Sequence, residues 1–269
     1  MDAKICAALL SQVRETRPLV HHITNTVTIN DCANITICAG AAPVMAEAAE
    51  ESAEMVTAAG ALVLNIGTLN PAQVKSMLLA GKKANELGVP VVLDPVGAGA
   101  TELRTEAVLR ILREVKVAVL KGNAGEIGVL AGAGGKVRGV DSCGLAGDPV
   151  ETAKACARAT GTVVAMTDET DVVTDGARVV LVRNGHVMME RLSGTGCMAS
   201  SVVGSFVAVA DDPLVGAAAA LVAFGRAGEK AAAAAGVRGP YSFRTALFDE
   251  LYVLTPEDLE AEGRLGVAA

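Results

Sequence analysis

Aromatic side chains are nearly absent from this 269-residue chain, which has no Trp, two Tyr and four Phe. Proteins that bind single-stranded nucleic acid stack the bases on aromatic platforms, so this scarcity argues against that class. Basic residues are also outnumbered, with 23 Lys and Arg against 30 Asp and Glu and a formal net charge of −7. Without a run of Lys or Arg, the chain lacks the electrostatic footprint of a nucleic-acid-binding protein.

Long apolar runs are missing as well. The longest one, around residues 202–210, is interrupted by Gly204 and Ser205 and is too short to span a bilayer. The first residues include Asp2 and Lys4 and contain no long apolar core, so they do not indicate a signal peptide. We therefore expect a cytoplasmic protein that does not associate with membranes.

Histidine and cysteine show no metal-ligand spacing. His21 and His22 are adjacent, and His186 is isolated. The six cysteines contain no C-x-x-C pair: Cys6, Cys32, Cys38, Cys143, Cys156 and Cys197. We interpret all but Cys197 as small buried side chains of a reduced protein, and the two adjacent histidines as residues lining the domain edge.

What the chain does have is small apolar residues in an alternating pattern. Of its residues, 51% are hydrophobic, and Ala, Gly and Val dominate. Small side chains let helices and strands approach closely, which suits layered α/β packing. Short apolar strands are predicted at residues 61–66, 89–94, 116–121 and 162–167. Helices are predicted at 71–87, 105–115, from about 123, and at 150–160. Continuous apolar strands alternating with helices predict a parallel sheet covered on both faces.

The pattern changes after residue 170. Three short strands are predicted at 171–174, 179–183 and 186–190, joined by the hairpin dipeptides Asp175-Gly176 and Asn184-Gly185. Helices follow at 198–210, 213–235 and 242–254. No linker divides the chain, and the glycine-rich stretch 132–147 is interpreted as an excursion within the domain. We therefore predict one domain over residues 1–269.

Ligands of open α/β sheets bind beyond the carboxyl ends of the strands, so the residues just after each strand deserve the most weight. Glycine stands beside a polar or charged residue in four of the five relevant stretches, a combination that suits close backbone approach to a polyanion. The stretches are 65–68, 94–99, 121–126, 167–168 and 194–197.

The last of these stretches, Gly194-Thr195-Gly196-Cys197, opens a predicted helix. Free backbone N–H groups and the helix dipole would form an anion site there and could stabilise a phosphoryl group in transfer. The structural alternative is a loop whose glycines serve turn geometry. A dinucleotide fingerprint is disfavoured, because the motif follows hairpins late in the chain and no acidic residue follows about 20 positions on. No P-loop motif is present.

Two carboxylates follow predicted strands. Asp94 and Glu126 could hold Mg²⁺ beside nucleotide phosphates, directly or through water. Alternatively, Asp94 is a turn residue before Pro95, and Glu126 is an acidic residue in the first turn of a helix capped by Asn123.

Cys197 falls in the first turn of its predicted helix. That setting lowers a thiol pKa and would make Cys197 a base or nucleophile. The alternative is a small side chain packed under the helix.

Together the motifs are more specific than any one of them. They occur in the order His22-Ile23-Thr24-Asn25, Ala42-Pro43-Val44-Met45, Leu64-Asn65-Ile66-Gly67-Thr68, Val92-Leu93-Asp94-Pro95-Val96-Gly97-Ala98-Gly99, Gly122-Asn123-Ala124-Gly125-Glu126-Ile127, Val173-Thr174-Asp175-Gly176 and Gly194-Thr195-Gly196-Cys197-Met198. From about Pro18 to Leu254 the chain closely resembles the hydroxyethylthiazole kinases of the ribokinase-like superfamily.

The resemblance implies a three-layer α/β sandwich with a mostly parallel central sheet covered by helices on both faces. It implies ATP- and Mg²⁺-dependent phosphorylation of the primary alcohol of 5-(2-hydroxyethyl)-4-methylthiazole in thiamine salvage. It also implies a homotrimer with active sites between subunits. The remaining alternatives are a related kinase for another small alcohol, such as hydroxymethylpyrimidine, and a ligand-binding relative without turnover.

Family roles carry over position by position. Substrate contacts fall on Met45, Asn25, Gly67 and Gly194, and nucleotide contacts on Lys121, Asn123 and Thr167. The Mg²⁺–phosphate carboxylates fall on Asp94 and Glu126, and the catalytic anion hole on Gly194, Thr195, Gly196 and Cys197. Most ribokinase-like relatives carry an Asp base where this chain and other thiazole kinases have Cys197.

The chain departs from the family pattern at two positions. Lys121 stands where Arg is usual, which keeps the charge but loses the bidentate fork. Asp168 stands where Gly is common, and its carboxylate would repel a triphosphate unless it points away or meets the metal.

Overall fold

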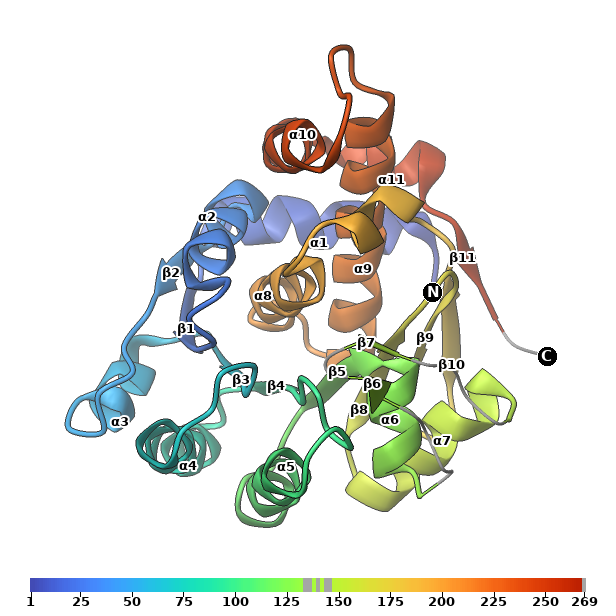
Figure 1. The fold of residues 1–269 in the computed structure, drawn as a ribbon. Coiled ribbons are helices and arrows are strands. Elements are labelled where there is room, and N and C mark those ends of the chain that lie inside the picture. Colours follow the sequence, from blue (N-terminus) through green and yellow to red (C-terminus); the bar gives the residue numbers. More distant parts are fainter. Residues whose placement is uncertain (133–136, 139–140, 143–146, 268–269) are drawn as a thin grey trace.

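The computed structural model describes residues 1–132, 137–138, 141–142 and 147–267. Nine of its strands form one sheet in the order β11-β10-β9-β8-β5-β4-β3-β1-β2 (Figure 1). The six strands from β8 to β2 are parallel, and β9, β10 and β11 add antiparallel pairs at the other edge. The strands are β1 (Leu19–Ile23), β2 (Ala42–Val44), β3 (Ala61–Asn65), β4 (Val91–Asp94), β5 (Val119–Asn123), β8 (Val163–Thr167), β9 (Asp171–Thr174), β10 (Val179–Val182) and β11 (Leu265–Gly266). A separate antiparallel pair joins β6 (Val137–Arg138) and β7 (Asp141–Ser142).

Helices cover both faces of the sheet, and a separate hydrophobic cluster fills each side. One layer holds α1 (Ala3–Thr16), α2 (Ile29–Ala39), α8 (Thr195–Val207), α9 (Pro213–Ala233), α10 (Pro240–Val253) and α11 (Pro256–Glu262). The other holds α3 (Ser52–Met55), α4 (Pro71–Leu87), α5 (Glu102–Glu114), α6 (Ala124–Leu130) and α7 (Pro149–Thr160). The predicted sandwich with a mostly parallel, doubly covered sheet is thus confirmed.

Local signals place several elements correctly. The predicted helix 71–87 matches α4. At its start the Asn70 side chain accepts a hydrogen bond from the backbone N–H of Gln73, and Gly88 ends the helix at φ +72°. The strand 171–174 matches β9. Most of the glycine-rich stretch 132–147 lies outside the described residues.

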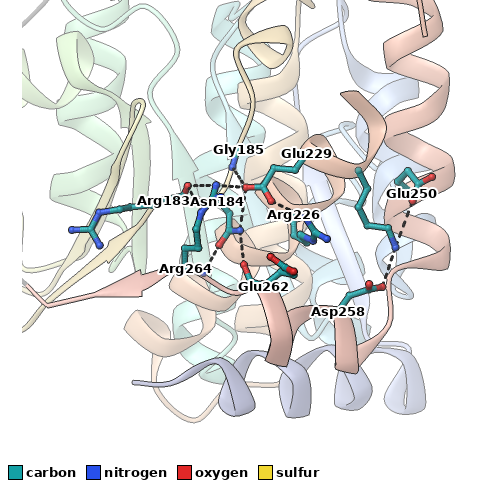
Figure 2. A network of polar contacts seen from close by, with 10 residues as sticks. Arg183, Asn184, Gly185, Arg226, Glu229, Glu250, Asp258, Glu262 and Arg264 are labelled. Atoms are coloured by element: carbon teal, nitrogen blue, oxygen red, sulfur yellow. Dashed lines mark hydrogen bonds and ion pairs between the residues drawn. The ribbon is translucent and has the colours of Figure 1, made fainter. Parts of the chain in front are cut away.

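The strand predicted at 186–190 is wrong: residues 187–191 form the short 3₁₀ helix η2 (Val187–Arg191). Figure 2 shows why Asn184-Gly185 makes no hairpin turn. The Asn184 amide donates to Glu229 Oε1 at 3.1 Å and to the Glu262 carbonyl at 2.9 Å, and the Gly185 N–H donates to the same Glu229 oxygen at 2.9 Å. These contacts hold the dipeptide against α9 and the C-terminal segment, and β10 pairs with β11 instead.

His21 and His22 do not line a domain edge. They lie in β1, between β2 and β3, and are 0% and 1% exposed. Burial lowers the pKa of both imidazoles, that of His22 to about 4, so they remain neutral at physiological pH.

Among the described residues, no helix is both long and apolar enough to cross a membrane.

Helix α8 lies unusually close to the sheet at Gly204. A Cβ added there would stand 2.5 Å from Val63 Cγ2 and 3.2 Å from Val20 Cγ1. We predict that Gly204→Ala lowers the free energy of unfolding, measured by urea denaturation. Overpacking costs about 1–3 kcal/mol, whereas Ala gains up to about 1 kcal/mol in a helix interior.

Gly239→Ala controls for an added methyl group without crowding, because a Cβ at Gly239, the N-terminal cap of α10, meets nothing within 4 Å. A free energy of unfolding of Gly204→Ala equal to or above that of the wild type would show that α8 is free to move away from the sheet.

Candidate active site

The parallel strands bring the predicted site residues to one edge of the sheet. Strand order places their carboxyl ends side by side, from β2 through β1, β3, β4 and β5 to β8. The residues at or just after these ends follow the same order: Met45, Asn25, Gly67, Asp94, Lys121 with Asn123, and Thr167. Residues up to 142 positions apart, 25 and 167, thus form a single row.

The centre of the row is the buried carboxylate of Asp94, which is 2% exposed. Its Oδ2 accepts hydrogen bonds from the Asn65 amide at 2.8 Å and from the Ser200 hydroxyl at 2.7 Å. Ser200 lies on α8, so this bond joins the helix to the end of β4. Sequence reasoning missed Ser200; its only signal is its position one turn after Gly196.

Asn25 extends this polar chain toward α8. Its amide donates to Asn65 Oδ1 at 2.9 Å and contacts Cys197 Sγ at 3.3 Å. Its Oδ1 accepts the N–H groups of residues 27 and 28, which turns the chain into α2. Gly67 approaches closely, since a Cβ there would stand 2.8 Å from Asn25 Cβ.

The Gly194–Cys197 motif opens α8 as predicted, but the helix begins at Thr195 rather than at residue 198, with Gly194 as its N-terminal cap at φ +92°. A Cβ on Gly194 would lie 2.3 Å from Thr28 Cγ2, so both backbone conformation and space require glycine here. The Thr195 hydroxyl donates to the Met189 carbonyl at 2.8 Å, which anchors the preceding loop. The first backbone N–H groups of this 13-residue helix have no intrahelical acceptors and can bind an anion.

Lys121 connects β5 to the same helix. Its Nζ donates to the Gly196 carbonyl at 3.0 Å, and the residue is only 3% exposed. The ammonium group therefore lies beside the helix N-terminus, where it can contact a phosphate.

Glu126 and Asn123 form a capping box at the start of α6. The backbone N–H of Glu126 donates to Asn123 Oδ1 at 2.9 Å, and the backbone N–H of Asn123 donates to Glu126 Oε2 at 2.9 Å. Glu126 Oε1 also accepts the Gly97 N–H at 2.7 Å, which ties the loop after β4 to α6. The capping alternative is thus correct, and it leaves Glu126 facing the same loop as Asp94.

Burial dominates the titration of the site. It raises the pKa of the Asp94 carboxyl, although the charge of Lys121 and the hydrogen bonds from Ser200 and Asn65 act to lower it. Burial, together with the Asp94 charge, raises the pKa of Glu126 to about 7.

The expectation of a lowered pKa for Cys197 is wrong. Burial and the Asp94 charge raise the pKa of its thiol to about 11 and outweigh its place in the first helical turn. At neutral pH Cys197 is a thiol, not a thiolate.

The two carboxylates fit a divalent cation shared with phosphates. Among the described residues, no group of three or more His, Cys, Asp or Glu side chains could hold a metal by itself. Both Glu126 oxygens already accept backbone N–H groups, which favours metal contact through water. Mg²⁺ keeps several waters and is usually bound by one or two carboxylates plus substrate phosphates.

The far end of the row carries Thr167 and Asp168. The Thr167 hydroxyl donates to the Gly122 carbonyl at 3.4 Å. Asp168 Oδ1 accepts the Glu169 N–H at 2.8 Å, and the Asp168 N–H donates to Asp171 Oδ1 at 3.1 Å. The Asp168 carboxylate thus has a partner within its own loop.

Met45 lies at the other end, just after β2, and is partly buried. The preceding residue, Val44, is the strand partner of His21 in β1. The His21 Nε2 forms a hydrogen bond with the Ala46 carbonyl at 2.7 Å. These contacts fix the backbone on both sides of Met45.

A doubly covered, mostly parallel sheet with buried carboxylates beneath a glycine-capped helix defines a small-molecule kinase of the ribokinase-like class. The model of the hydroxyethylthiazole kinase family matches residues 10–257, and the chain belongs to this family. It is 71% identical to the hydroxyethylthiazole kinase of Methanoculleus marisnigri, over 98% of this chain and 94% of that protein.

Solved structures agree. A hydroxyethylthiazole kinase from Pyrococcus horikoshii superposes with a TM-score of 0.89 at 43% identity, covering 99% of this chain and 100% of that one. The pyridoxal kinase of Bacillus subtilis shares the fold, with a TM-score of 0.59 at 17% identity over 80% of this chain and 92% of that one. The predicted family is thus confirmed.

Asp171, the first residue of β9, provides a test of the electrostatics at the β8 end of the row. Burial raises the pKa of its carboxyl from 3.8 to about 7. Between these values the unfolded chain loses the proton while the folded one keeps it, so stability falls as pH rises. Asp171→Asn removes this loss. We therefore predict that the free energy of unfolding of the variant, relative to that of the wild type, rises between about pH 4 and about pH 7.

Urea denaturation across this pH range measures the effect. Asp211→Asn is the control for the same substitution at an exposed position. Parallel stability curves for Asp171→Asn and the wild type would contradict the prediction.

Proposed function

We propose that this protein transfers the γ-phosphoryl group of ATP to the primary alcohol of 5-(2-hydroxyethyl)-4-methylthiazole, a step of thiamine salvage. The family and the order of residues along the sheet edge support this. Met45, Asn25, Gly67 and Gly194 bind the thiazole. Lys121, Asn123 and Thr167 bind ATP.

The anion hole lies between these two groups. In the proposed reaction the alcohol oxygen attacks the γ-phosphorus in line as the bond to the ADP oxygen breaks, and the proton of the alcohol passes to solvent water. Backbone N–H groups from Gly194 to Cys197 stabilise charge on the equatorial oxygens. Positioning supplies most of the acceleration, because the loose transition state requires little from a base. Cys197, a neutral thiol held by the Asn25 amide, serves as a contact rather than as a thiolate base.

Asp94 and Glu126 hold Mg²⁺ in this proposal, Asp94 by its carboxylate and Glu126 through water. The ion supplies neutralisation of the phosphate charge. The raised pKa values of both carboxyl groups support a cation at this point, because burial and mutual repulsion make two uncompensated charges costly.

We further propose a cytoplasmic homotrimer with active sites between subunits. The cysteines at positions 6, 32, 38, 156 and 197 are unpaired, which fits a reducing compartment. Val27 is 70% exposed two residues after Asn25, so apolar surface borders the substrate end. A neighbouring subunit would cover this surface.

The proposed activity predicts ADP release that depends on the thiazole alcohol. We expect a coupled assay to show turnover with ATP, Mg²⁺ and 5-(2-hydroxyethyl)-4-methylthiazole, and only background without the alcohol. Stimulation by hydroxymethylpyrimidine instead would identify a kinase of another alcohol. Nucleotide binding without any stimulated ADP release would identify a non-catalytic relative.

Lys121 is predicted to bind the nucleotide rather than the alcohol. A hydrogen bond to a charged group contributes about 1.5–3 kcal/mol, so Lys121→Met should raise KM for ATP about 10- to 100-fold. KM for the thiazole should change less than about threefold. The exposed Lys116, just before β5, provides the control Lys116→Met, which should leave both constants unchanged. An increase confined to KM for the thiazole would refute this assignment.

A further inference from the structure

Arg104 holds together two loops at the carboxyl edge of the sheet. It lies in the first turn of α5, where the Thr101 hydroxyl accepts its N–H. Its guanidinium group donates to the Ile66 carbonyl at 3.1 Å, the Gly67 carbonyl at 2.9 Å and the Val96 carbonyl at 2.8 Å. The first two acceptors follow β3, and the third follows β4.

These loops carry different parts of the proposed site. The loop after β3 carries Gly67, which packs against Asn25 on the thiazole side. The loop after β4 carries Gly97, whose N–H donates to Glu126 Oε1 on the phosphate side. Arg104 therefore connects the substrate side to the phosphate side, and the one proposed binding residue that it contacts is Gly67, through the backbone carbonyl.

A planar guanidinium is suited to this task. Its donors diverge at fixed angles, so three simultaneous bonds fix the separation and orientation of the two loops. Lysine cannot do the same, because its three donors radiate from a single nitrogen. Thr105, the residue after Arg104, strengthens the arrangement, because its hydroxyl accepts a hydrogen bond from the Gly99 N–H at 3.0 Å. The first turn of α5 thus holds the loop after β4 at both of its ends.

We propose that Arg104 is a positioning residue that sets the distance between the alcohol and the phosphoryl group. The inference rests on the proposed function for its catalytic consequence. Loosening one loop against the other leaves each ligand's own contacts in place but misaligns the reacting atoms. A misplacement of about 1 Å can cost about 100-fold in rate. Arg104 consequently acts on turnover and not on the binding of either substrate.

Arg14 offers a matched control. Its guanidinium group also donates to three backbone carbonyls, those of Leu251, Tyr252 and Leu254 at the end of α10. It is partly buried, like Arg104, but α1 and α10 lie on the opposite face of the sheet from α5 (Figure 1). Arg14→Met and Arg104→Met therefore remove the same kind of interaction from two different places.

The test compares steady-state kinetics and calorimetric binding of each substrate, below the melting temperature of every variant. For Arg104→Met we expect kcat to fall about 10- to 100-fold, with Kd for ATP and for the thiazole alcohol within about threefold of the wild type. Arg14→Met should keep kcat within about twofold. Arg104→Lys should give an intermediate kcat.

Three results would overturn the proposal. The first is an equal loss of kcat in Arg14→Met, which would make the effect one of general stability. The second is a loss expressed wholly as weaker binding of one substrate. The third is full activity of Arg104→Lys, since charge without the planar fork would then suffice.

Hydrogen exchange of the ligand-free proteins gives a readout that does not depend on turnover. Arg104→Met should speed exchange in both loops, residues 66–69 and 96–99, and Arg14→Met in neither. Unchanged exchange in these loops would overturn the proposal even if the wild type proved inactive on the thiazole. Conversely, faster exchange with an inactive wild type would refute the proposed function and leave Arg104 as the connection between the loops.

Discussion

Burial of the Asp94 carboxylate is the constraint on which the rest of the site depends. A buried charge is costly unless it is hydrogen-bonded and balanced. Asn65 from β3 and Ser200 from α8 supply the bonds, and the charge of Lys121 from β5 supplies the balance. Three elements are thereby drawn to one carboxylate. The same contacts hold the glycine-capped start of α8 over the end of β4, where a phosphoryl group would need it.

Small side chains make this arrangement possible. Gly204 lets α8 lie against Val63, and Gly194 lets its first turn pass close to Thr28. The helical layer around α8 and α9 is rich in buried Ala, so the helices sit close to the sheet. The scarcity of aromatic residues noted in the sequence follows from this packing. In the proposed complex both rings would be held mainly by backbone and aliphatic surface, with Met45 as the large side chain at the thiazole end.

Sequence reasoning succeeded where short-range signals decide the structure. Asn70-Pro71 marks the start of α4 and Gly88 marks its end, and glycines after apolar runs mark the strand ends. It failed where distant partners decide. Asn184-Gly185 has the composition of a hairpin turn, but Glu229 on α9 binds both residues. The position of Cys197 in a first turn suggested a lowered pKa, but burial beside Asp94 dominates. The contacts of Ser200 and Arg104 span 106 and up to 38 residues, and no local motif announces them.

In the proposed function, the balance of charge sets how a small number of residues would recognise a triphosphate. Burial raises the pKa values of Asp94, Glu126 and Asp171, and Lys121 is the cation that lowers each of them. One ammonium group facing three carboxyl groups gives a bare triphosphate little net attraction. A divalent ion reverses this balance, because it neutralises the carboxylates and phosphates together. The helix N-terminus then adds directed N–H groups without adding a side-chain charge. In the proposed function the nucleotide therefore arrives with its metal, and Lys121 refines the position of that complex rather than supplying most of its attraction.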